Sequence, residues 1–273
     1  MPPPRYALGV IAPAGFVELR AAAEIGWLLA ELAPHGLQPF WANLTPLPGA
    51  KGRGGVGSLV VAGRELVVRP YQRGGALGKL LRDRYPSPQR ARNELAVLAE
   101  LRAQGVPVVA PIAAVAQRRG AFWRLRLCTE RVPEALPLPA FLAAHPELRR
   151  HTATAVGTLV RLAFAAGLRH PDLHLDNVLC APRGDRVRAV LVDLDRAKLR
   201  GPLTTADTDA MLSRLLRHLV RHQQRLAATP SRTEMLRFLQ ALGLPRSDRA
   251  EAWQRIANHL RRDLNRRRWF RRR

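Results

Sequence analysis

Short apolar runs separated by polar turns characterise the first half of the chain. Ser58–Val61 and Glu65–Arg69 are two such runs, and the turn Ala62-Gly63-Arg64 between them predicts a β-hairpin. Val106–Val115 and Phe122–Thr129 predict two further strands, because a polar turn separates them. We therefore expect the first half of the chain to be rich in β-structure.

Helical periodicity is found at two places in this half. The stretch from Pro88 to Gln104 has proline at its start, Gly105 just after its end, and leucines at helical spacing in between. This pattern predicts a single helix among the strands. Arg20–Leu32 is a candidate amphipathic helix closer to the N-terminus.

The pattern becomes helical in the second half. A Pro-rich stretch, Pro133–Pro139, fits a linker, and Leu148–Leu168 predicts a long, mostly buried helix. Three more helices are predicted at Thr204–Leu226, at Thr229–Leu242 and from Asp248 to the end. A β-rich part followed by a larger helical part favours the α+β class, with two lobes.

The predicted elements divide the chain into four parts. We expect an N-terminal extension over residues 1–45 and a β-rich N-lobe over residues 46–134. A helical C-lobe should follow over residues 135–227, and a helical C-terminal extension with an Arg-rich tail over residues 228–273.

Charge changes the picture, because 45 Lys and Arg residues stand against 21 Asp and Glu residues, a formal net charge of +24. Such an excess favours an anionic partner: nucleic acid, a membrane surface or a phosphorylated substrate. No zinc-finger, helix-turn-helix or RNA-recognition motif supports the nucleic-acid alternative. Cys128 and Cys180 lie far apart without metal-ligand spacing, which favours a reducing compartment over a disulfide framework.

Three polar residues in the second half have the spacing that kinase-type phosphoryl transfer requires. Asp172 is followed by Asn177 five positions later, and Asp193 closes an apolar run. One carboxylate must meet the attacking hydroxyl, while an amide oxygen and a second carboxylate hold Mg²⁺ against the phosphates of ATP. Pairing of Val178–Leu179 with Val187–Val192 as a hairpin should bring Asp193 beside Asn177. Asp172 is thus the expected catalytic base, and Asn177 and Asp193 are the expected metal ligands.

The first half contains a second phosphate signal. Gly52, Gly54 and Gly57 match G-x-G-x-x-G immediately before a strand, where glycines let the backbone approach phosphates closely. A strand rather than a helix follows, which excludes a dinucleotide fold and favours a kinase lid over ATP. Such a lid is accompanied by a strand cation that pairs with a helix glutamate. The strand offers Arg69 and the helix offers Glu94; Lys79 is the alternative cation.

Two histidines flank Asp172. His170 lies where kinases use a histidine to brace the catalytic loop, so we interpret it as structural. His174 either contacts the substrate or fills the loop, and neither histidine has the partner spacing of a zinc site. Asp195 is either a further acid behind the site or a helix cap.

Several segments resemble the 3-deoxy-D-manno-octulosonic acid (Kdo) kinase family, a group of bacterial lipopolysaccharide kinases with a protein-kinase-like fold. The resemblance spans about residues 50–220 and is carried by Lys51–Gly54, Val68–Gly75, Gly78–Tyr85, Gly105–Ile112 and the loop HPDLHLDNVL. It implies ATP-dependent phosphorylation of a Kdo sugar on the lipid A–core lipopolysaccharide precursor. It also implies that Asp172 is the catalytic aspartate and that Arg69 matches an arginine that replaces the usual lysine.

The chain departs from this family's pattern in the catalytic loop. The family usually has Leu-Asn and then His-Asn, where this chain has Leu173-His174 and Asp176-Asn177, and the strand ends in Asp193-Leu194-Asp195. A heptose or another core sugar therefore stays open as the acceptor. A soluble kinase of the aminoglycoside or choline type would share the loop but not the block from Arg73 to Tyr85. An inactive module should have lost Asp172, Asn177 or Asp193, and a protein kinase should have a longer activation segment.

The C-terminus predicts contact with an anionic membrane surface. Arg261–Arg273 contains eight arginines and one acid, and Trp253, Ile256, Leu260 and Leu264 precede or enter it at helical spacing. This pattern suits an amphipathic anchor on anionic lipid, although a core-packed last helix with a charged end fits equally. No apolar stretch reaches the ~18 residues of a membrane span, and no signal peptide is evident. With the family resemblance, this predicts a peripheral protein on the cytoplasmic side of the inner membrane.

Overall fold

The computed structural model describes residues 8–9, 17–21, 40, 44–47, 55–73, 81–221 and 230–271, with the backbone alone at 8–9, 17–21, 221 and 263–271. The chain divides into two compact units. The first comprises Met1–Ala103 and Val109–Arg131, and the second comprises Gln104–Val108 and Val132–Arg273.

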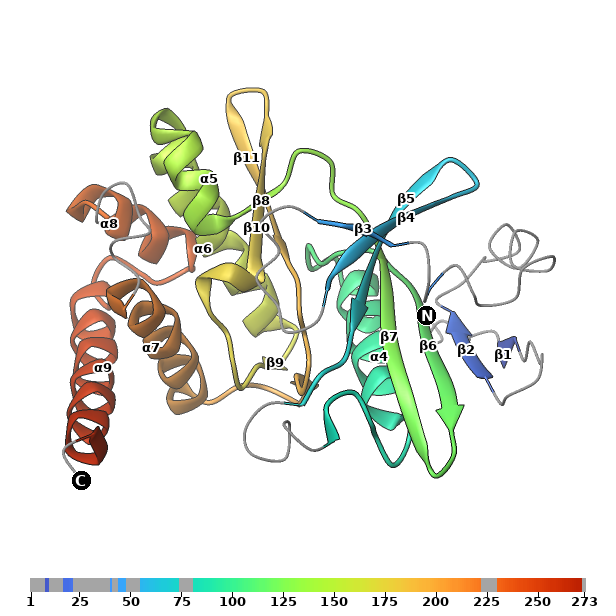
Figure 1. The fold of residues 1–273 in the computed structure, drawn as a ribbon. Coiled ribbons are helices and arrows are strands. Elements are labelled where there is room, and N and C mark those ends of the chain that lie inside the picture. Colours follow the sequence, from blue (N-terminus) through green and yellow to red (C-terminus); the bar gives the residue numbers. More distant parts are fainter. Residues whose placement is uncertain are drawn as a thin grey trace. The chain divides into compact units, whose positions relative to one another are not determined.

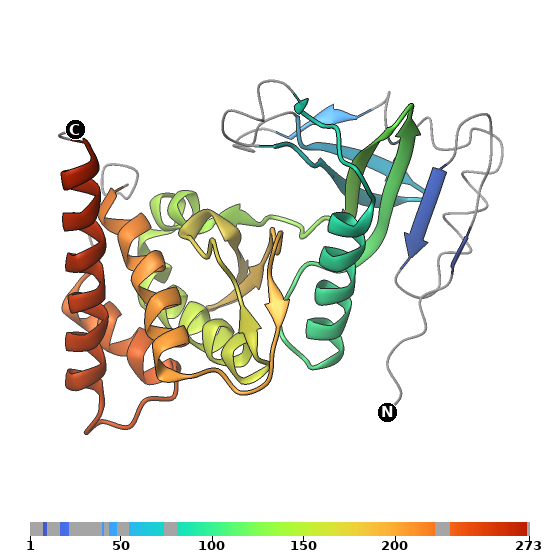
Figure 2. The same cartoon turned by 90° about the horizontal axis from the view of Figure 1, so that it is seen from below.

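The first unit is built on one antiparallel sheet (Figure 1). Its strands are β1 (Leu8–Gly9), β2 (Val17–Ala21), β3 (Thr45–Pro46), β4 (Gly57–Val61), β5 (Arg64–Pro70), β6 (Pro111–Arg119) and β7 (Phe122–Glu130). In the described part of the chain the sheet has the order β1-β2-β6-β7-β5-β4-β3. Helix α4 (Gln89–Ala103) packs on β6 and β7 and buries Leu95, Leu98 and Leu101 (Figures 1 and 2).

The predicted hairpin and the single helix of this half are both present. The hairpin β4–β5 turns at Ala62-Gly63, and α4 lies within one residue of its predicted ends. The predicted strand from Val106 begins only at Pro111. Its first three residues, up to Val108, belong to the second unit, where Leu191 N–H donates to the Pro107 carbonyl. The helix predicted from Arg20 is wrong at its start, since Arg20 and Ala21 pair with β6; residues 22–32 lie outside the described residues.

The second unit is mainly helical (Figure 1). Its helices are α5 (Leu138–Ala144), α6 (Arg149–Ala165), α7 (Thr205–Arg221), α8 (Arg232–Ala241) and α9 (Arg249–Arg271), with short 3₁₀ turns η1 (Pro146–Leu148) and η2 (Leu175–Asn177). Its strands are β8 (Leu136–Pro137), β9 (Leu168–Arg169), β10 (Val178–Arg183), β11 (Arg186–Leu191) and β12 (Lys198–Leu199). Strands β11-β10-β8 form one small sheet and β12-β9 another.

Helix α6 is the centre of this unit, packing on α8 and on β11. It buries Val156, Leu159 and Val160. Gly157 allows α8 to approach closely, because a Cβ there would lie 2.6 Å from the Phe238 carbonyl oxygen. The long helix predicted over this region is therefore confirmed, and a tight helix–helix contact holds it in place.

The last helix uses its apolar stripe inside the fold. Helix α9 packs on α7, and Ile256 is 2% exposed. Trp253 and Leu260 line an apolar cavity of about 330 Å³ among the helices of this unit. The apolar residues of α9 up to Leu260 therefore pack inside the unit. For this part of α9, this favours a core-packed helix over a membrane anchor. None of the helices in the described ranges is both long and apolar enough to cross a membrane.

Candidate active site

The loop between β9 and β10 carries two of the predicted site residues. Asp172 is exposed in the turn, and Asn177 ends η2 with only 4% of its surface exposed. The Asn177 amide nitrogen donates to the Asp172 carbonyl oxygen at 2.9 Å. This hydrogen bond closes the loop and directs the other end of the amide, Oδ1, away from the Asp172 backbone.

Asp193 reaches the same loop through the hairpin β10–β11. Val178 pairs with Leu191, and the Val192 N–H donates to the Asn177 carbonyl oxygen at 2.9 Å. Asp193 follows directly with a φ of +56°, a left-handed conformation that is uncommon outside glycine. Non-glycine residues in this region carry backbone strain and cluster at functional sites. The structure thus places Asp172, Asn177 and Asp193 around one loop.

His170 joins the two ends of this arrangement. Its Nδ1 accepts from the Asp172 N–H at 3.1 Å, and its Nε2 lies 2.9 Å from the Asp193 carbonyl oxygen. Because Nδ1 is an acceptor, the tautomer that satisfies both contacts carries its proton on Nε2. Burial lowers the pKa of His170 below its ordinary value, which favours this neutral form, although the Asp193 contact acts in the opposite direction. The bracing role expected from the sequence has a direct structural counterpart in these contacts.

Arg69 and Glu94 meet in the first unit. The Arg69 Nη2 donates to both carboxylate oxygens of Glu94, at 2.6 and 2.7 Å. Glu94 is almost fully buried in α4, whereas 23% of the Arg69 side chain is exposed on β5. A buried carboxylate therefore holds an arginine that keeps an exposed edge.

Tyr71 is a member of this cluster that sequence reasoning missed. Its hydroxyl donates to Glu94 Oε2 at 2.6 Å, and the Arg69 guanidinium carbon lies 4.8 Å from the centre of its ring. Both contacts fix the glutamate and the arginine together. The spacing could have predicted this contact. Tyr71 follows Arg69 by two residues, and alternate residues of an extended segment face the same side.

The predicted glycine lid is only partly described. Gly52 and Gly54 lie outside the described residues, as does the alternative cation Lys79. Gly57 opens β4, where an added Cβ would lie 2.6 Å from the Leu44 Cβ. Close packing against Leu44 thus requires glycine at position 57 independently of any phosphate.

The described residues fit the Mg²⁺ ion that kinase chemistry implies. Since the Asn177 nitrogen is committed to the Asp172 carbonyl, its Oδ1 is the atom oriented as a ligand. The Asp193 carboxylate would supply a second hard oxygen ligand, the type that Mg²⁺ prefers. These two donors, an amide and a carboxylate, match the set that kinases use.

An aspartate in a closed loop, an asparagine five residues later and an aspartate at the end of the next hairpin define a phosphotransferase of the protein-kinase-like class. The chain belongs to the lipopolysaccharide kinase (Kdo/WaaP) family, whose family model matches residues 40–242. This membership confirms the predicted enzyme class, a kinase that acts on an alcohol group of a lipopolysaccharide sugar.

Curated relatives support the same assignment. The chain is 32% identical over 169 residues to a 3-deoxy-D-manno-octulosonic acid kinase of Vibrio vulnificus, covering 60% of this chain and 71% of the relative. It is also 32% identical over 186 residues to a protein of the same name from Xylella fastidiosa, covering 67% of this chain and 72% of the relative.

Solved structures confirm the predicted α+β, protein-kinase-like fold. A structure of WaaP in complex with acyl carrier protein matches with a TM-score of 0.57 and 22% identity, covering 82% of this chain and 90% of that one. An aminoglycoside-3'-phosphotransferase of type VIII matches with a TM-score of 0.50 and 20% identity, covering 86% and 99% respectively. At these identities the likeness concerns the fold alone.

Proposed function

We propose that this kinase transfers the γ-phosphoryl group of ATP to a hydroxyl group of Kdo on a lipid A–core lipopolysaccharide precursor. The observation that carries the chemistry is the closed loop that places Asp172, Asn177 and Asp193 together. The sugar is supported by the curated relatives, which are named as Kdo kinases. Family membership favours a lipopolysaccharide acceptor over the soluble small-molecule acceptors that the sequence left open.

Asp172 is the proposed general base. Its side chain is exposed, while its backbone is fixed from both sides by His170 and Asn177. A rigid backbone beneath an accessible carboxylate suits a group that must meet an incoming hydroxyl in one orientation. As the sugar oxygen bonds to phosphorus, its proton passes to the Asp172 carboxylate, and ADP leaves with the electrons of the broken P–O bond.

Asn177 and Asp193 are the proposed ligands for Mg²⁺. When bound, Mg²⁺ neutralises the charge that develops on the phosphates. Arg69 is the proposed phosphate-binding cation, because Glu94 holds it while 23% of its side chain stays exposed to solvent. The Gly52, Gly54 and Gly57 lid stays part of the proposal, as a source of backbone N–H groups for phosphate oxygens.

We further propose that the basic end of α9 holds the protein on anionic membranes at the cytoplasmic face of the inner membrane. Arg261 and Arg262 are exposed, while the apolar stripe before them is used in packing. Each basic residue near an anionic leaflet contributes ~1 kcal/mol. If half of the eight tail arginines reach the surface, roughly 4 kcal/mol of salt-sensitive attraction follows.

Truncation after Leu260 tests this membrane contact. The shortened chain should no longer sediment with phosphatidylserine vesicles at physiological salt, whereas the full chain should. Activity on a short, soluble acceptor should change little, because every proposed catalytic residue precedes Lys198. Equal sedimentation of both chains would show that the tail is not the anchor.

The acceptor is tested with the purified full chain, ATP and two matched acceptors, a Kdo-bearing lipid A precursor and the same molecule extended by heptose. Tandem mass spectrometry locates the added phosphate. Phosphate on Kdo in both acceptors supports the proposal, and phosphate only on heptose overturns the Kdo assignment. The Asp172→Asn variant is the matched control: its kcat should fall by at least about 10²-fold while ATP binding persists.

A further inference from the structure

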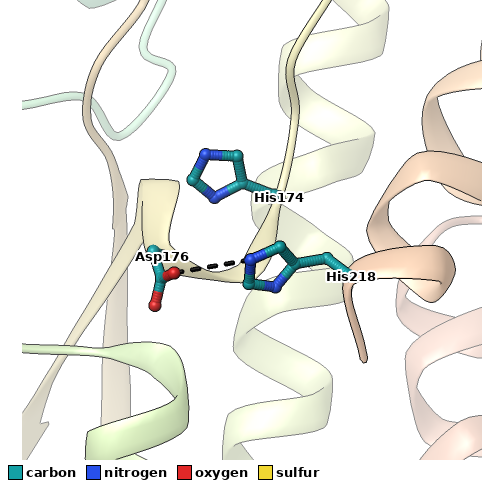
Figure 3. Close-up of side chains that lie close together, drawn as sticks. All are labelled: His174, Asp176 and His218. Carbon is teal, nitrogen blue, oxygen red and sulfur yellow. Dashed lines mark ion pairs between the residues drawn. The ribbon is translucent and has the colours of Figure 1, made fainter. Parts of the chain in front are cut away.

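A second cluster of ligand-type side chains is formed by two residues of the catalytic loop and one of α7, and none of the three has a role in the proposed phosphoryl transfer (Figure 3). His174 precedes η2, Asp176 lies within η2, and His218 comes from α7. One ligand atom from each residue lies within 4.8 Å of the others, and all three side chains are half-buried. Figure 3 shows the two imidazole rings and the carboxylate gathered around a common point.

The contacts within this cluster are those of a site that is nearly formed. His218 Nε2 lies 3.4 Å from Asp176 Oδ2. The two imidazole rings lie within 17° of parallel, with centroids 4.8 Å apart. His174 Nδ1 is shielded from solvent and has no hydrogen-bond partner among the residues that the structure describes. A shielded polar atom without a partner destabilises a fold, and a metal bound at that nitrogen would offset the cost.

We propose that His174, Asp176 and His218 bind a divalent transition-metal ion of the Zn²⁺ class, separate from the Mg²⁺ of the phosphoryl-transfer site. Two imidazole nitrogens and a carboxylate oxygen form a donor set typical of Zn²⁺, Co²⁺ and Ni²⁺, whereas Mg²⁺ prefers oxygen ligands. Three protein ligands leave a further position for water. The proposal does not depend on the identity of the sugar acceptor.

The spacing of the donors agrees with this ion. Zinc ligands lie about 2.0–2.2 Å from the metal, so two ligands in a tetrahedral arrangement are roughly 3.3 Å from each other. The His218–Asp176 pair already has a separation of 3.4 Å. The His174 ligand atom lies within 4.8 Å of the other two, so metal binding requires it to move closer to them.

The bound ion would act as a clamp between two distant segments. Asp176 and Asn177 are adjacent, and Asn177 holds the Asp172 backbone, so a metal on Asp176 restrains the loop that carries the proposed base. His218 would fasten this loop to α7, which itself packs on α9. The cluster is thus placed to stabilise the catalytic loop.

The test uses the full chain after chelator treatment and removal of the chelator, without nucleotide or Mg²⁺. Isothermal titration with Zn²⁺ and the visible absorption of bound Co²⁺ report on the site. We expect one Zn²⁺ per chain, a raised melting temperature, and a Co²⁺ spectrum of low coordination number. His218→Ala should weaken binding by at least about 100-fold, since loss of even an outer-shell partner costs 10–100-fold. The matched control is His151→Ala, which removes an exposed histidine of α6 and should leave binding unchanged.

A second variant guards against loss of folding. His174→Ala approaches the same site from the loop instead of α7, and circular dichroism confirms that each variant is folded. Weakened Zn²⁺ binding in both folded variants, with normal binding in His151→Ala, supports the site. Zn²⁺ affinity equal to that of the wild type in either folded variant overturns it. Absence of measurable Zn²⁺ and Co²⁺ binding by the wild type overturns it as well.

Discussion

Each unit of this protein contains a largely buried arginine–glutamate pair in which the glutamate also accepts from a third group. In the first unit, Glu94 accepts from Arg69 and from the Tyr71 hydroxyl. In the second unit, Glu234 accepts from the Arg149 Nε at 2.8 Å and from the Ser231 N–H at 2.7 Å. The two pairs therefore present nearly the same local chemistry.

Their surroundings differ. Glu234 belongs to a capping box, so its carboxylate caps the N-terminus of α8. Arg149 is the first residue of α6. This pair joins two helix N-termini, and both side chains are about equally buried, with 12% and 11% exposed. In the other pair the burial is unequal, because Glu94 is 1% exposed and Arg69 is 23% exposed.

This difference in burial indicates different roles. The Arg149–Glu234 pair joins two helices, whereas the Arg69–Glu94 pair positions a cation. A pair buried equally on both sides has its charges directed at each other. In the first pair, the buried Glu94 holds the more exposed Arg69 in place, and we propose that Arg69 binds a phosphate of ATP. The first pair should therefore matter mainly for catalysis, and the second mainly for stability.

Arg69→Met is expected to have the largest effect. Removing a group that stabilises developing charge typically lowers kcat by about 10²–10³-fold, so kcat/KM with ATP should fall by this amount. Steady-state kinetics measure it, normalised to the folded fraction from circular dichroism. Arg149→Met is the matched control and should keep its activity per folded molecule. Nearly wild-type kinetics for Arg69→Met would assign the phosphate cation to another residue, with Lys79 the first candidate.

Arg149→Met should instead lower the free energy of unfolding. Removing one partner of a buried ion pair costs about 3–5 kcal/mol, and the remaining exposure of this pair reduces the cost to about 2–3 kcal/mol. Urea unfolding followed by circular dichroism measures it. Replacing Glu234 by Met as well should recover part of the loss, because the unpaired carboxylate is then gone. Absence of any recovery would locate the cost in packing rather than charge.

The second pair should also respond to acid. The Glu234 carboxyl is partly desolvated, but the Arg149 and Ser231 hydrogen bonds outweigh this and hold its pKa below the ordinary value of 4.5. Its contribution to stability is therefore complete above pH 4.5 and is lost as the pH falls through the lowered pKa. The stability difference between the wild type and Glu234→Gln should thus shrink on acidification from pH 7 to below 4.5. A difference that stayed constant across this range would exclude ionisation of Glu234 as its source.

The sequence predicted those features that depend on neighbouring residues. Helix α4, the hairpins and the loop around Asp172 follow from local apolar patterns and turn residues, and the Arg69–Glu94 pair follows from a motif-based expectation. The second pair was not predicted, because Arg149 and Glu234 are 85 residues apart and neither belongs to a motif. His218 was missed for the same reason: it reaches the catalytic loop only when α7 has packed.

Long-range pairing also explains the errors in the predicted elements. Arg20 and Ala21 fit a helical pattern, but they form part of β2 because their backbone pairs with β6. The apolar positions on α9 were equally compatible with a membrane and with α7 as partner. Packing on α7 uses Ile256, a choice that periodicity alone does not encode.

Tyr71→Phe is expected to have the smallest effect, and it tests what the third donor contributes. Glu94 keeps Arg69 in this variant, so only the 2.6 Å hydrogen bond from the hydroxyl is lost. A hydrogen bond to a charged group contributes about 1.5–3 kcal/mol, and the upper part of this range is not expected while the arginine remains. Stability should therefore fall by about 1.5–2 kcal/mol, measured by urea unfolding. The KM for ATP should rise by no more than about threefold, since the cation is still held.

The donor that corresponds to the Tyr71 hydroxyl in the second unit is the Ser231 backbone N–H, which no side-chain truncation removes. The control for Tyr71→Phe is therefore a double-mutant cycle with Glu94→Gln in the first unit. Additive losses in that cycle would mean that the hydroxyl does not act through Glu94.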